Sequence, residues 1–391
     1  MKIGFVGLGK LGLPVAAAIA SKGHTVCGTD ANPTVAGYIA SGEVPYQEAG
    51  LCDLTRVRWC DTVAEVVASS ELVFVAVQTP HDPAYEGVTP APAERRDFEY
   101  QYLANAYREV CRHVTTQTVA VISTVLPGTM QRVILPQGAA RTVYNPFFIA
   151  MGTVTEDFLK PEFVIVGADD PVAVDHMRRF YKTIHARPVV TTSVASAELV
   201  KVAYNGVISA KIVLANWVGE ICEKTAADAD EVHTALSHAV DRLWSPRYFK
   251  AGMGDGGGCH PRDNIALSHL AERLDLSVDV GGWVTASREA HCQWLADIVK
   301  GWCRQTGLQA WVCGREYKPE TNLTNGSPSR LLASMLLCGF CDYEPAEPGV
   351  YVIGCDHAKY RTWKWPKGSV IVDPFGNIPD TPGVTVHRIG R

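Results

Sequence analysis

The chain of 391 residues is long enough for two or three domains, each with a hydrophobic core of its own. Charged residues make up 20% of it and hydrophobic residues 47%, and the net charge of −5 argues against a basic surface for nucleic acid. No run of 18 apolar residues and no signal-peptide pattern occur, so we expect a cytoplasmic protein without a membrane span.

Strand-like apolar runs alternate with helical patterns through the first half of the chain. Alternation of this kind predicts βαβ units and a parallel sheet. The expected strands are residues 2–6, 25–30, 72–77, 118–123, 142–144 and 163–166, and the expected helices include residues 14–21 and 102–113.

The pattern changes at Ala197, where one long helix is expected to run to about residue 224, and further helices follow to about residue 300. A strand–helix–strand pattern then returns with residues 309–313, 330–337 and 350–353. We therefore predict an α/β protein with two Rossmann-like parallel-sheet domains, joined by a long central helix and a helical spine. The expected domains are residues 1–195, 196–300 and 301–391.

A glycine-rich turn follows the first expected strand without a gap. It reads Gly7-Leu8-Gly9-Lys10-Leu11-Gly12, and the second strand ends at Asp30, 18 residues past Gly12. Glycines here allow a tight turn, close approach of the backbone to a pyrophosphate, and close packing of helix on strand. Asp30 would accept hydrogen bonds from ribose hydroxyls and repel a 2′-phosphate. The motif therefore predicts that NAD rather than NADP binds at Gly7, Gly9, Lys10, Leu11, Gly12 and Asp30.

The segment from residue 251 to 263, AGMGDGGGCHPRD, places one cysteine among glycines. Glycines fill no space in a core, but they let a backbone approach a ligand and leave Cys259 reachable. A nucleophilic thiolate needs such access, so we expect Cys259 to be catalytic, with an inert buried cysteine as the alternative. Cys338 and Cys341 form a lone C-x-x-C without further ligands, and we expect no metal site.

Further motifs occur in the order typical of one enzyme family. They are residues 45–51 (PYQEAGL), Gln78-Thr79-Pro80, residues 123–128 (STVLPG), Glu198 to Lys201 with Asn205, Gly257-Gly258-Cys259 with Asp263, and Tyr317-Lys318-Pro319. Over nearly its whole length the chain resembles the UDP-glucose/GDP-mannose dehydrogenase family. The resemblance implies a divergent homodimeric enzyme that oxidises a nucleotide sugar, such as UDP-glucose, at C6 to the uronate in two hydride transfers to NAD.

The resemblance also assigns roles to the three domains. Residues 1–195 would bind NAD, and residues 196–300 would form a helical region for dimerisation and catalysis. Residues 301–391 would be a shortened domain that binds the nucleotide sugar.

The same resemblance implies roles for particular residues. Cys259 would add to the intermediate aldehyde as a thiohemiacetal and then carry a thioester. Lys201 and Asn205, four residues apart on one helix face, would hold an alkoxide oxygen, although Lys201 alone also fits a solvated helix charge. Asp263 would orient that lysine or a water. The implied catalytic residues are Cys259, Lys201, Asn205, Asp263 and Thr124. The cofactor would also contact Thr79, Pro80 and Thr124. The substrate would bind to Phe147, Phe148, Ile149, Lys201, Asn205, Tyr248, Lys250, Gly256, Gly257 and Lys318.

The chain departs from the family in the loop of residues 145–152, which reads NPFFIAMG where the family has N-P-E-F-L-x-E-G. Phe147 and Met151 replace two glutamates, the first of which is expected to help activate the hydrolytic water. Phenylalanine accepts no proton, so hydrolysis of the thioester is the step most affected, and His260 is a candidate replacement base. Asp255 stands where the family has an aromatic residue, which changes the sugar pocket.

Two alternatives follow from these departures. One is an oxidoreductase that performs a single or redox-neutral oxidation, such as ring-carbon oxidation or epimerisation. The other is a non-catalytic protein that binds nucleotide sugars.

Overall fold

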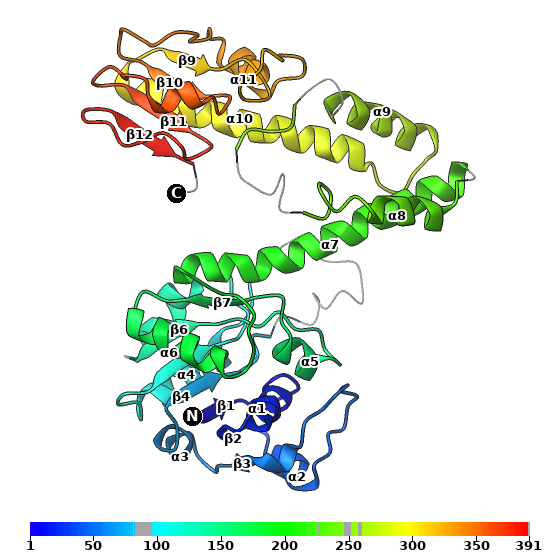
Figure 1. Cartoon of the computed structure of the whole chain (residues 1–391), viewed down its shortest axis with the longest axis vertical. Helices are drawn as coiled ribbons and strands as arrows, with labels where there is room; N and C mark the ends of the chain where they lie inside the picture. Colours follow the sequence, from blue (N-terminus) through cyan, green and yellow to red (C-terminus); the bar gives the residue numbers. More distant parts are fainter. Residues whose placement is uncertain are drawn as a thin grey trace. The chain divides into compact units, whose positions relative to one another are not determined.

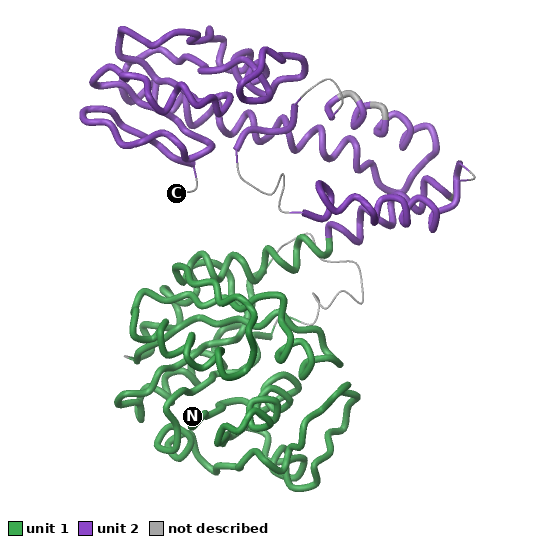
Figure 2. Tube along the Cα trace, in the orientation of Figure 1, with its two compact units in different colours: residues 1–209 green, residues 210–391 purple. Residues whose placement is uncertain are grey.

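The computed structural model describes residues 1–80, 82, 96–138, 140–225, 227–245, 252–256 and 260–389. The chain forms two compact units, residues 1–209 and residues 210–391 (Figure 2). Each unit contains one sheet dominated by parallel strands, and a long helix crosses the boundary between the units. The predicted fold class is therefore confirmed.

Unit 1 is built on an eight-stranded sheet in the order β3-β2-β1-β4-β5-β6-β7-β8 (Figure 1). Neighbouring strands are parallel except β6 and β7, which pair antiparallel at Tyr144 and Gly167 and so depart from the expected parallel arrangement. Strands β3 and β8 are additions to the prediction: β3 has three residues and β8 is only partly buried, so neither carries a clear apolar run. The strands are β1 (Lys2–Val6), β2 (Thr25–Thr29), β3 (Val57–Trp59), β4 (Leu72–Val75), β5 (Thr118–Val121), β6 (Arg141–Tyr144), β7 (Val164–Gly167) and β8 (Val189–Thr192).

Helices cover both faces of this sheet, so its central strands are apolar throughout. Successive residues of one strand belong to different cores: Phe74 of β4 packs on one face and Val75 on the other. The first face is covered by α1 (Gly12–Ser21), α2 (Thr34–Ser41), α5 (Val154–Leu159) and α6 (Pro171–Lys182). The second is covered by α3 (Val63–Ala68), α4 (Gln101–Cys111) and the π-helical turn Met130–Ile134. Short 3-10 turns occupy Leu54–Arg56 and Leu135–Gln137.

Helix α7 (Val194–Thr225) runs for 32 residues across the boundary of the two units. It is followed in unit 2 by α8 (Ala229–Ser237), α9 (His260–Arg273) and α10 (Val280–Thr306). Asp279 caps α10 by accepting a hydrogen bond from the Gly282 amide, and Gly307 ends the helix with a left-handed conformation. Among the residues that the structure describes, no helix is long and apolar enough to cross a membrane.

The sheet of unit 2 has four parallel strands in the order β12-β11-β10-β9. Helices α10 and α11 (Pro328–Leu336) cover one face of it. The other face packs against a segment with a 3-10 turn (Ala358–Arg361), from which Tyr360 and Trp365 are buried. The strands are β9 (Ala310–Cys313), β10 (Val350–Ile353), β11 (Val370–Asp373) and β12 (Thr385–Arg388), the last two of which the sequence pattern did not reveal.

Candidate active site

A cavity of about 1110 Å³ opens in unit 1 where β1, β2, β4 and β5 end. Strand β1 lies between β2 and β4, so connections leave it in opposite directions. In open α/β sheets, ligands bind at such a switch point, beyond the carboxyl ends of the strands. The fold therefore places a ligand site at the turn that follows β1.

The glycines of the turn after β1 are needed for two different reasons: two of them avoid clashes within the protein, and one leaves space for a ligand. Gly7 has a φ of +101°, and a β-carbon on it would lie 2.5 Å from the carbonyl oxygen of Ala76. A β-carbon on Gly12 would collide with the carbonyl of Gly7. A β-carbon on Gly9, in contrast, would meet no protein atom within 4 Å, although Gly9 lines the cavity. The open space at Gly9, beside the start of α1, fits a bound pyrophosphate.

Asp30, which follows β2, lines the same cavity. Its Oδ2 accepts a hydrogen bond of 2.7 Å from the Leu8 amide, and its Oδ1 accepts one of 2.8 Å from the Asn32 amide. These two bonds fix the carboxylate beside the glycine turn. Each oxygen keeps a second lone pair, which can accept a hydrogen bond from a ribose hydroxyl.

The loops after β4 and β5 meet at the middle of the cavity. The hydroxyl of Thr79 donates a hydrogen bond of 2.8 Å to the carbonyl oxygen of Thr124, and both residues line the cavity. Lys10 and Leu11 line it as well, whereas Pro80 does not; the carbonyl of Pro80 accepts a hydrogen bond from the Glu99 amide.

Lys201 of α7 lies at the opposite end of the cavity from Asp30. Strands β2 and β6 are four positions apart in the sheet, which separates the two ends by roughly 19 Å. The Lys201 side chain is 9% exposed, and its Nζ donates a hydrogen bond of 2.7 Å to the carbonyl oxygen of Phe147. The same Nζ lies 5.3 Å from the centre of the Phe148 ring. Burial lowers the pKa of the Lys201 ammonium below its ordinary range.

Glu198, one turn before Lys201, fixes α7 to the loop after β5. Its side chain is buried, and its two oxygens accept hydrogen bonds of 2.6 Å and 2.7 Å from the amides of Gly128 and Met130. The sequence showed Glu198 as part of a motif but not this role. Helix α7 contains both polar and apolar residues. In its sequence, a buried glutamate three residues before Lys201 cannot be told from a solvent-exposed glutamate.

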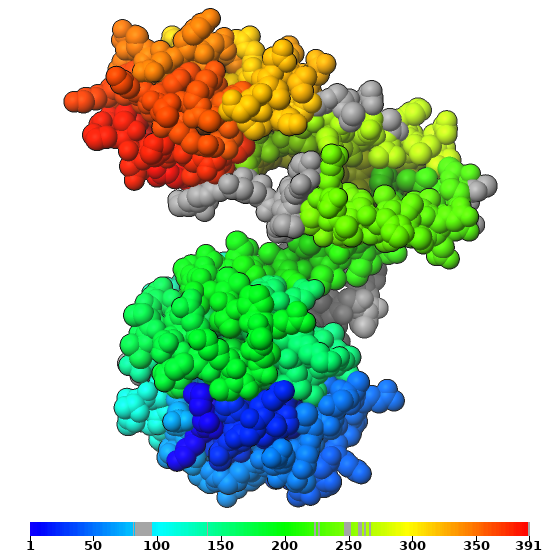
Figure 3. Space-filling model, in the orientation of Figure 1, coloured from blue at the N-terminus to red at the C-terminus, as the bar shows by residue number. Residues whose placement is uncertain are grey.

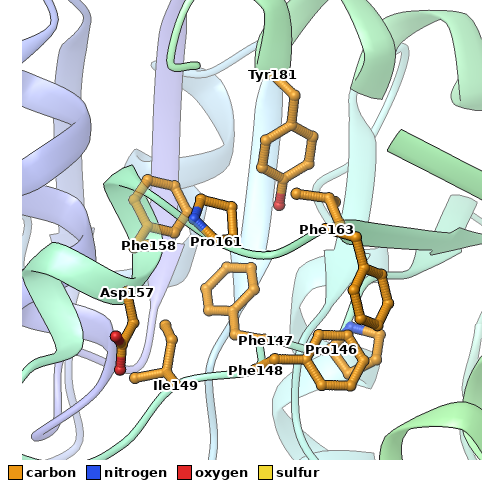
Figure 4. Close-up of a pocket in the computed structure, with 10 residues that line it drawn as sticks. Pro146, Phe147, Phe148, Ile149, Asp157, Phe158, Pro161, Phe163 and Tyr181 are labelled. Atoms are coloured by element: carbon orange, nitrogen blue, oxygen red, sulfur yellow. The ribbon is translucent and has the colours of Figure 1, made fainter. Parts of the chain in front are cut away.

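Phe147 belongs to the hydrophobic core and also lines the cavity of unit 1. It is 8% exposed, and its ring centre lies 5.4 Å from that of Phe158 and 6.1 Å from that of Phe74. Figure 4 shows the Phe147 ring together with Phe158, Pro161 and Tyr181, around a small apolar cavity of about 20 Å³. A carboxylate at position 147 would therefore be surrounded by aromatic rings.

The next residues of this loop lie beside Lys201 or line the cavity. The Phe148 ring packs 4.6 Å from that of Phe163 and 4.8 Å from that of Tyr204, and the Tyr204 hydroxyl donates to Glu162 at 3.2 Å. Ile149 and Met151 line the cavity. Asn205, one turn after Lys201 on α7, is exposed.

Gly256, Asp263 and Lys318 lie in unit 2. Asp263 is exposed in the first turn of α9, which begins with the exposed His260, and Lys318 is exposed in the loop after β9. A β-carbon on Gly256 would lie 2.5 Å from the β-carbon of Tyr317, so this backbone packs directly against unit 2. The other expected residues, Cys259, Gly257, Tyr248 and Lys250, lie outside the described residues.

Asp255 forms an ion pair with Arg288 of α10, with 2.8 Å between Oδ1 and Nε. Arg288 also donates hydrogen bonds to the carbonyl oxygens of Asp255, at 3.1 Å, and Gly326, at 2.9 Å. The carboxylate that replaces the family's aromatic residue therefore ties the segment 252–256 to unit 2.

The cavity residues Asp61 and Tyr102 lie outside the sequence motifs. Gln78 also lines the cavity of unit 1; it belongs to the motif Gln78-Thr79-Pro80, but no role was expected for it. Asp61 follows β3, the short strand that the apolar pattern did not reveal. With β3 identified, the rule that ligands bind beyond strand ends would have indicated Asp61.

Comparison with known proteins gives two family matches. Residues 1–185 match the model of the "UDP-glucose/GDP-mannose dehydrogenase family, NAD binding domain", and residues 195–287 match the model of its central domain.

Three curated relatives have similar sequence identities to this chain. YtcA of Bacillus subtilis, which carries the name of a UDP-glucose 6-dehydrogenase, is 30% identical over 363 residues, covering 89% of this chain and 82% of the relative. GDP-mannose 6-dehydrogenase of Pseudomonas aeruginosa is 28% identical over 359 residues, covering 86% and 79%. UDP-glucose 6-dehydrogenase of Rhizobium meliloti is 28% identical over 351 residues, covering 84% and 77%.

Among solved structures, a ternary complex of GDP-mannose dehydrogenase from Pseudomonas aeruginosa superposes with a TM-score of 0.87. It is 24% identical, and the match covers 99% of both chains. A UDP-glucose dehydrogenase from the archaeon Pyrobaculum islandicum matches with a TM-score of 0.55 at 24% identity, covering 99% of this chain and 96% of that one. At this level of identity, both structures support the fold.

Proposed function

The chain belongs to the UDP-glucose/GDP-mannose dehydrogenase family, and we propose that it oxidises the C6 alcohol of a UDP-glucose-like nucleotide sugar to the uronate. It is an NAD-dependent oxidoreductase of the nucleotide-sugar dehydrogenase type. The observation that carries the proposal is one cavity lined by the fixed carboxylate of Asp30 at one end and by the buried side chain of Lys201 at the other. The proposal assigns the carboxylate to the ribose of the dinucleotide, and the lysine to the oxygen of the alcohol that is oxidised.

The proposed chemistry assigns a task to each residue. NAD, when bound, accepts a hydride from the sugar carbon. Lys201 and Asn205 donate hydrogen bonds to the sugar oxygen as it gains negative charge. The Cys259 sulfur bonds to the aldehyde carbon as a thiohemiacetal, and a second oxidation leaves a thioester that water cleaves. Asp263 orients the lysine or that water, and Thr124 contacts the cofactor.

The bonding of Lys201 supports its part in this proposal. Its Nζ is held by a backbone carbonyl, that of Phe147, and an ammonium group has three donors. Two donors therefore remain for a substrate oxygen and a water. In a buried, water-poor site, such donors stabilise a developing negative charge more strongly than they would in bulk water.

We assign contacts with the nucleotide sugar residue by residue. In unit 1 the proposed contacts are made by the loop that contains Phe147, Phe148 and Ile149, two of which line the cofactor cavity. In unit 2 and in the segments outside the described residues, we assign the remaining contacts to Tyr248, Lys250, Gly256, Gly257 and Lys318.

Phe147 favours a second candidate function. Its ring occupies the core at the position where the family has the glutamate expected to assist hydrolysis. An enzyme that stops after one oxidation, or that returns the hydride to a ring carbon, would need no such group. A single or redox-neutral oxidation of the same class of substrate is therefore the alternative.

The ratio of NADH formed to sugar consumed separates these candidates. The measurement uses the full chain with a panel of UDP-, GDP- and TDP-sugars, and Cys259→Ser as the matched variant. Two NADH per sugar, lost in Cys259→Ser, supports oxidation to the uronate. One NADH or none supports the second candidate, and binding of the sugars without any reduction of NAD would indicate a binding protein instead.

We also propose that the protein is a cytoplasmic homodimer. Helix α7 carries exposed apolar side chains. The residues of this helix are coloured green in the space-filling view (Figure 3). Ile212 is 56% exposed and Val213 is 50% exposed, which is unusual for neighbouring apolar residues in a helix. Buried free thiols such as those of Cys27 and Cys313 suit a reducing compartment.

A further inference from the structure

The cavity of unit 1 extends past Asp30 to the end of β3. Strand β3 pairs with β2, with Trp59 opposite Gly28, and the Cys60 amide donates a hydrogen bond of 2.9 Å to the carbonyl oxygen of Gly28. Continued by two residues, this register places Asp61 beside Asp30, at a strand spacing of roughly 4.8 Å. Both residues line the cavity. The cavity therefore offers a place for the part of a ligand that lies beyond the ribose assigned to Asp30.

A dinucleotide in this cavity would run along the ends of the strands. Its pyrophosphate fits the open space at Gly9, after β1, and its adenosine ribose fits the carboxylate of Asp30, after β2. The adenine is joined to that ribose, and β3 is the next strand after β2 in the sheet order. The end of β3 is therefore where the adenine of NAD would lie.

Side chains from two neighbouring helices line this part of the cavity. Val63 is the first residue of α3, and Tyr102 and Ala106 lie four residues apart on one face of α4. Helices α3 and α4 cover the same face of the sheet. Tyr102 is 57% exposed, so a large part of its ring is free to stack on a planar base. Such walls suit an aromatic base of either purine type.

The Asp61 carboxylate adds a polar group to these walls. Its Oδ1 accepts a hydrogen bond of 3.0 Å from the indole nitrogen of Trp59, and its amide donates one of 3.2 Å to Oε2 of Glu65. Glu65 is held in turn by Arg58, at 2.5 Å. Within the described part of the chain, these bonds leave Oδ2 of Asp61 without a partner. An ionised carboxylate only accepts hydrogen bonds, so this oxygen favours a ligand group that donates one.

We propose that Asp61 recognises the base of the cofactor by accepting a hydrogen bond from the 6-amino group of adenine. Hypoxanthine has an oxygen in place of that amino group. A dinucleotide with hypoxanthine would therefore lose the donor and place its oxygen against the carboxylate, which a site built for a donor rejects. This inference concerns the cofactor and unit 1, so it does not depend on which sugar is oxidised.

Binding of NAD and of nicotinamide hypoxanthine dinucleotide to the full chain tests the inference without any sugar. Titration calorimetry of the wild type should show NAD bound at least about tenfold more tightly, because a hydrogen bond to a charged group is lost with hypoxanthine. Asp61→Asn keeps an oxygen for the Trp59 indole and adds an amide that can donate to the hypoxanthine oxygen. In this variant the preference for NAD should fall to about threefold or less. Asp175→Asn, at an exposed position of α6, removes the same charge and should keep the preference of the wild type.

Tyr102→Ala separates stacking from recognition of the amino group. Stacking on an aromatic ring does not depend on the substituent of the base, so this variant should bind both dinucleotides about tenfold more weakly and keep their ratio. Equal binding of the two dinucleotides by the wild type, or an unchanged ratio in Asp61→Asn, would show that Asp61 does not contact the amino group. Unchanged binding of NAD by Tyr102→Ala would show that the base does not lie at the end of β3, and the inference would fail with it.

Discussion

The side chain of Phe147 affects both the proposed hydrolysis step and the stability of unit 1. The sequence indicated that a proton acceptor is replaced by phenylalanine, and the structure adds that the ring is part of an aromatic core with Phe74, Phe158 and Tyr181. A glutamate introduced there would place its carboxylate among these rings, at the edge of the cavity that Phe147 and Lys201 both line. Restoring the family residue at this position is therefore not expected to restore hydrolysis by itself.

Phe147→Glu should destabilise unit 1 strongly. Loss of a buried aromatic ring costs about 3–5 kcal/mol, and burial of an unpaired carboxylate adds to that cost. Urea or thermal unfolding of the variant should show this loss. Met151→Glu is the matched control, because it places the same charge in the same loop on a side chain that is 60% exposed. Equal stability of the two variants would mean that the ring of Phe147 is not packed as described.

Asp30→Ala should weaken NAD binding and reduce the preference for NAD over NADP. The carboxylate is fixed by the amides of Leu8 and Asn32, so its charge stays where a 2′-phosphate would lie. Binding of the two cofactors can be compared by titration calorimetry in wild type and variant. A wild type that binds NADP ten times more tightly than NAD, a difference of about 1.4 kcal/mol, would contradict this assignment of the ribose site.

Lys201→Ala should lower kcat far more than it raises KM. A contact to an oxygen that gains charge during the reaction is stronger in the transition state than in the bound substrate. The expected loss in kcat is on the order of 10²-fold, as for removal of one oxyanion donor. Steady-state kinetics with the best sugar of the panel would measure it, and a variant with most of its turnover would show that Lys201 does not contact the reacting oxygen.

At the scale of elements, strands that alternate with clear helical patterns were predictable, whereas β3, β8, β11 and β12 were not. Strand β11 was missed although all four of its residues are buried. Strand β1 and the glycine turn have the expected positions because an apolar run, a turn and a helix start follow one another without a gap. Strands β3 and β12 have three and four residues with mixed exposure, so their pattern does not differ from that of a loop. The antiparallel pairing of β6 and β7 rests on one register pair and leaves no mark in the sequence.

Glu198 holds helix α7 against the loop after β5 through two hydrogen bonds, and this contact supports the site. Glu198→Ala removes two charge-assisted hydrogen bonds and leaves the amides of Gly128 and Met130 without their buried acceptor. We expect a loss of about 2–4 kcal/mol in the free energy of unfolding, together with weaker NAD binding, because the loop after β5 lines the cavity.

Denaturant unfolding and a cofactor titration would measure these two effects. Glu198→Gln keeps one carbonyl acceptor and should lose less stability than Glu198→Ala. Glu156→Ala, at an exposed position of α5, is the control for loss of a surface carboxylate. If Glu198→Ala unfolds at the same denaturant concentration as Glu156→Ala, α7 is not fixed to the loop by this residue.

At the scale of the whole molecule, the proposed site residues are distributed over both units. Asp30, Lys201 and Asn205 belong to unit 1, whereas Gly256, Asp263 and Lys318 belong to unit 2. The order of the motifs in the sequence also assigns these residues to different domains. It did not predict which side chains hold the loops in place, such as Glu198 in unit 1 and Arg288 in unit 2, because those contacts join segments far apart in the chain.

The last prediction concerns the proposed homodimer. Apolar side chains of α7 recur at helical spacing over the part of the helix that crosses the unit boundary, and each is more than a third exposed within the chain. These residues are Val207, Ile208, Ile212, Val213 and Leu214. A second copy of the helix would remove this surface from water, at about 25 cal/mol for each Å² of apolar area.

Ile212→Asp should therefore separate the copies, because a carboxylate in a dimer interface would lose its hydration without gaining a partner. Sedimentation velocity should give about twice the chain mass of 42.4 kDa for the wild type and the chain mass itself for the variant at micromolar concentration. Asn105→Asp, at an exposed position of α4, controls for the added charge and should leave the mass unchanged. Circular dichroism would check that the variant stays folded. A wild type that sediments as a single chain at every concentration, or an Ile212→Asp variant that keeps the double mass, would mean that α7 is not the interface.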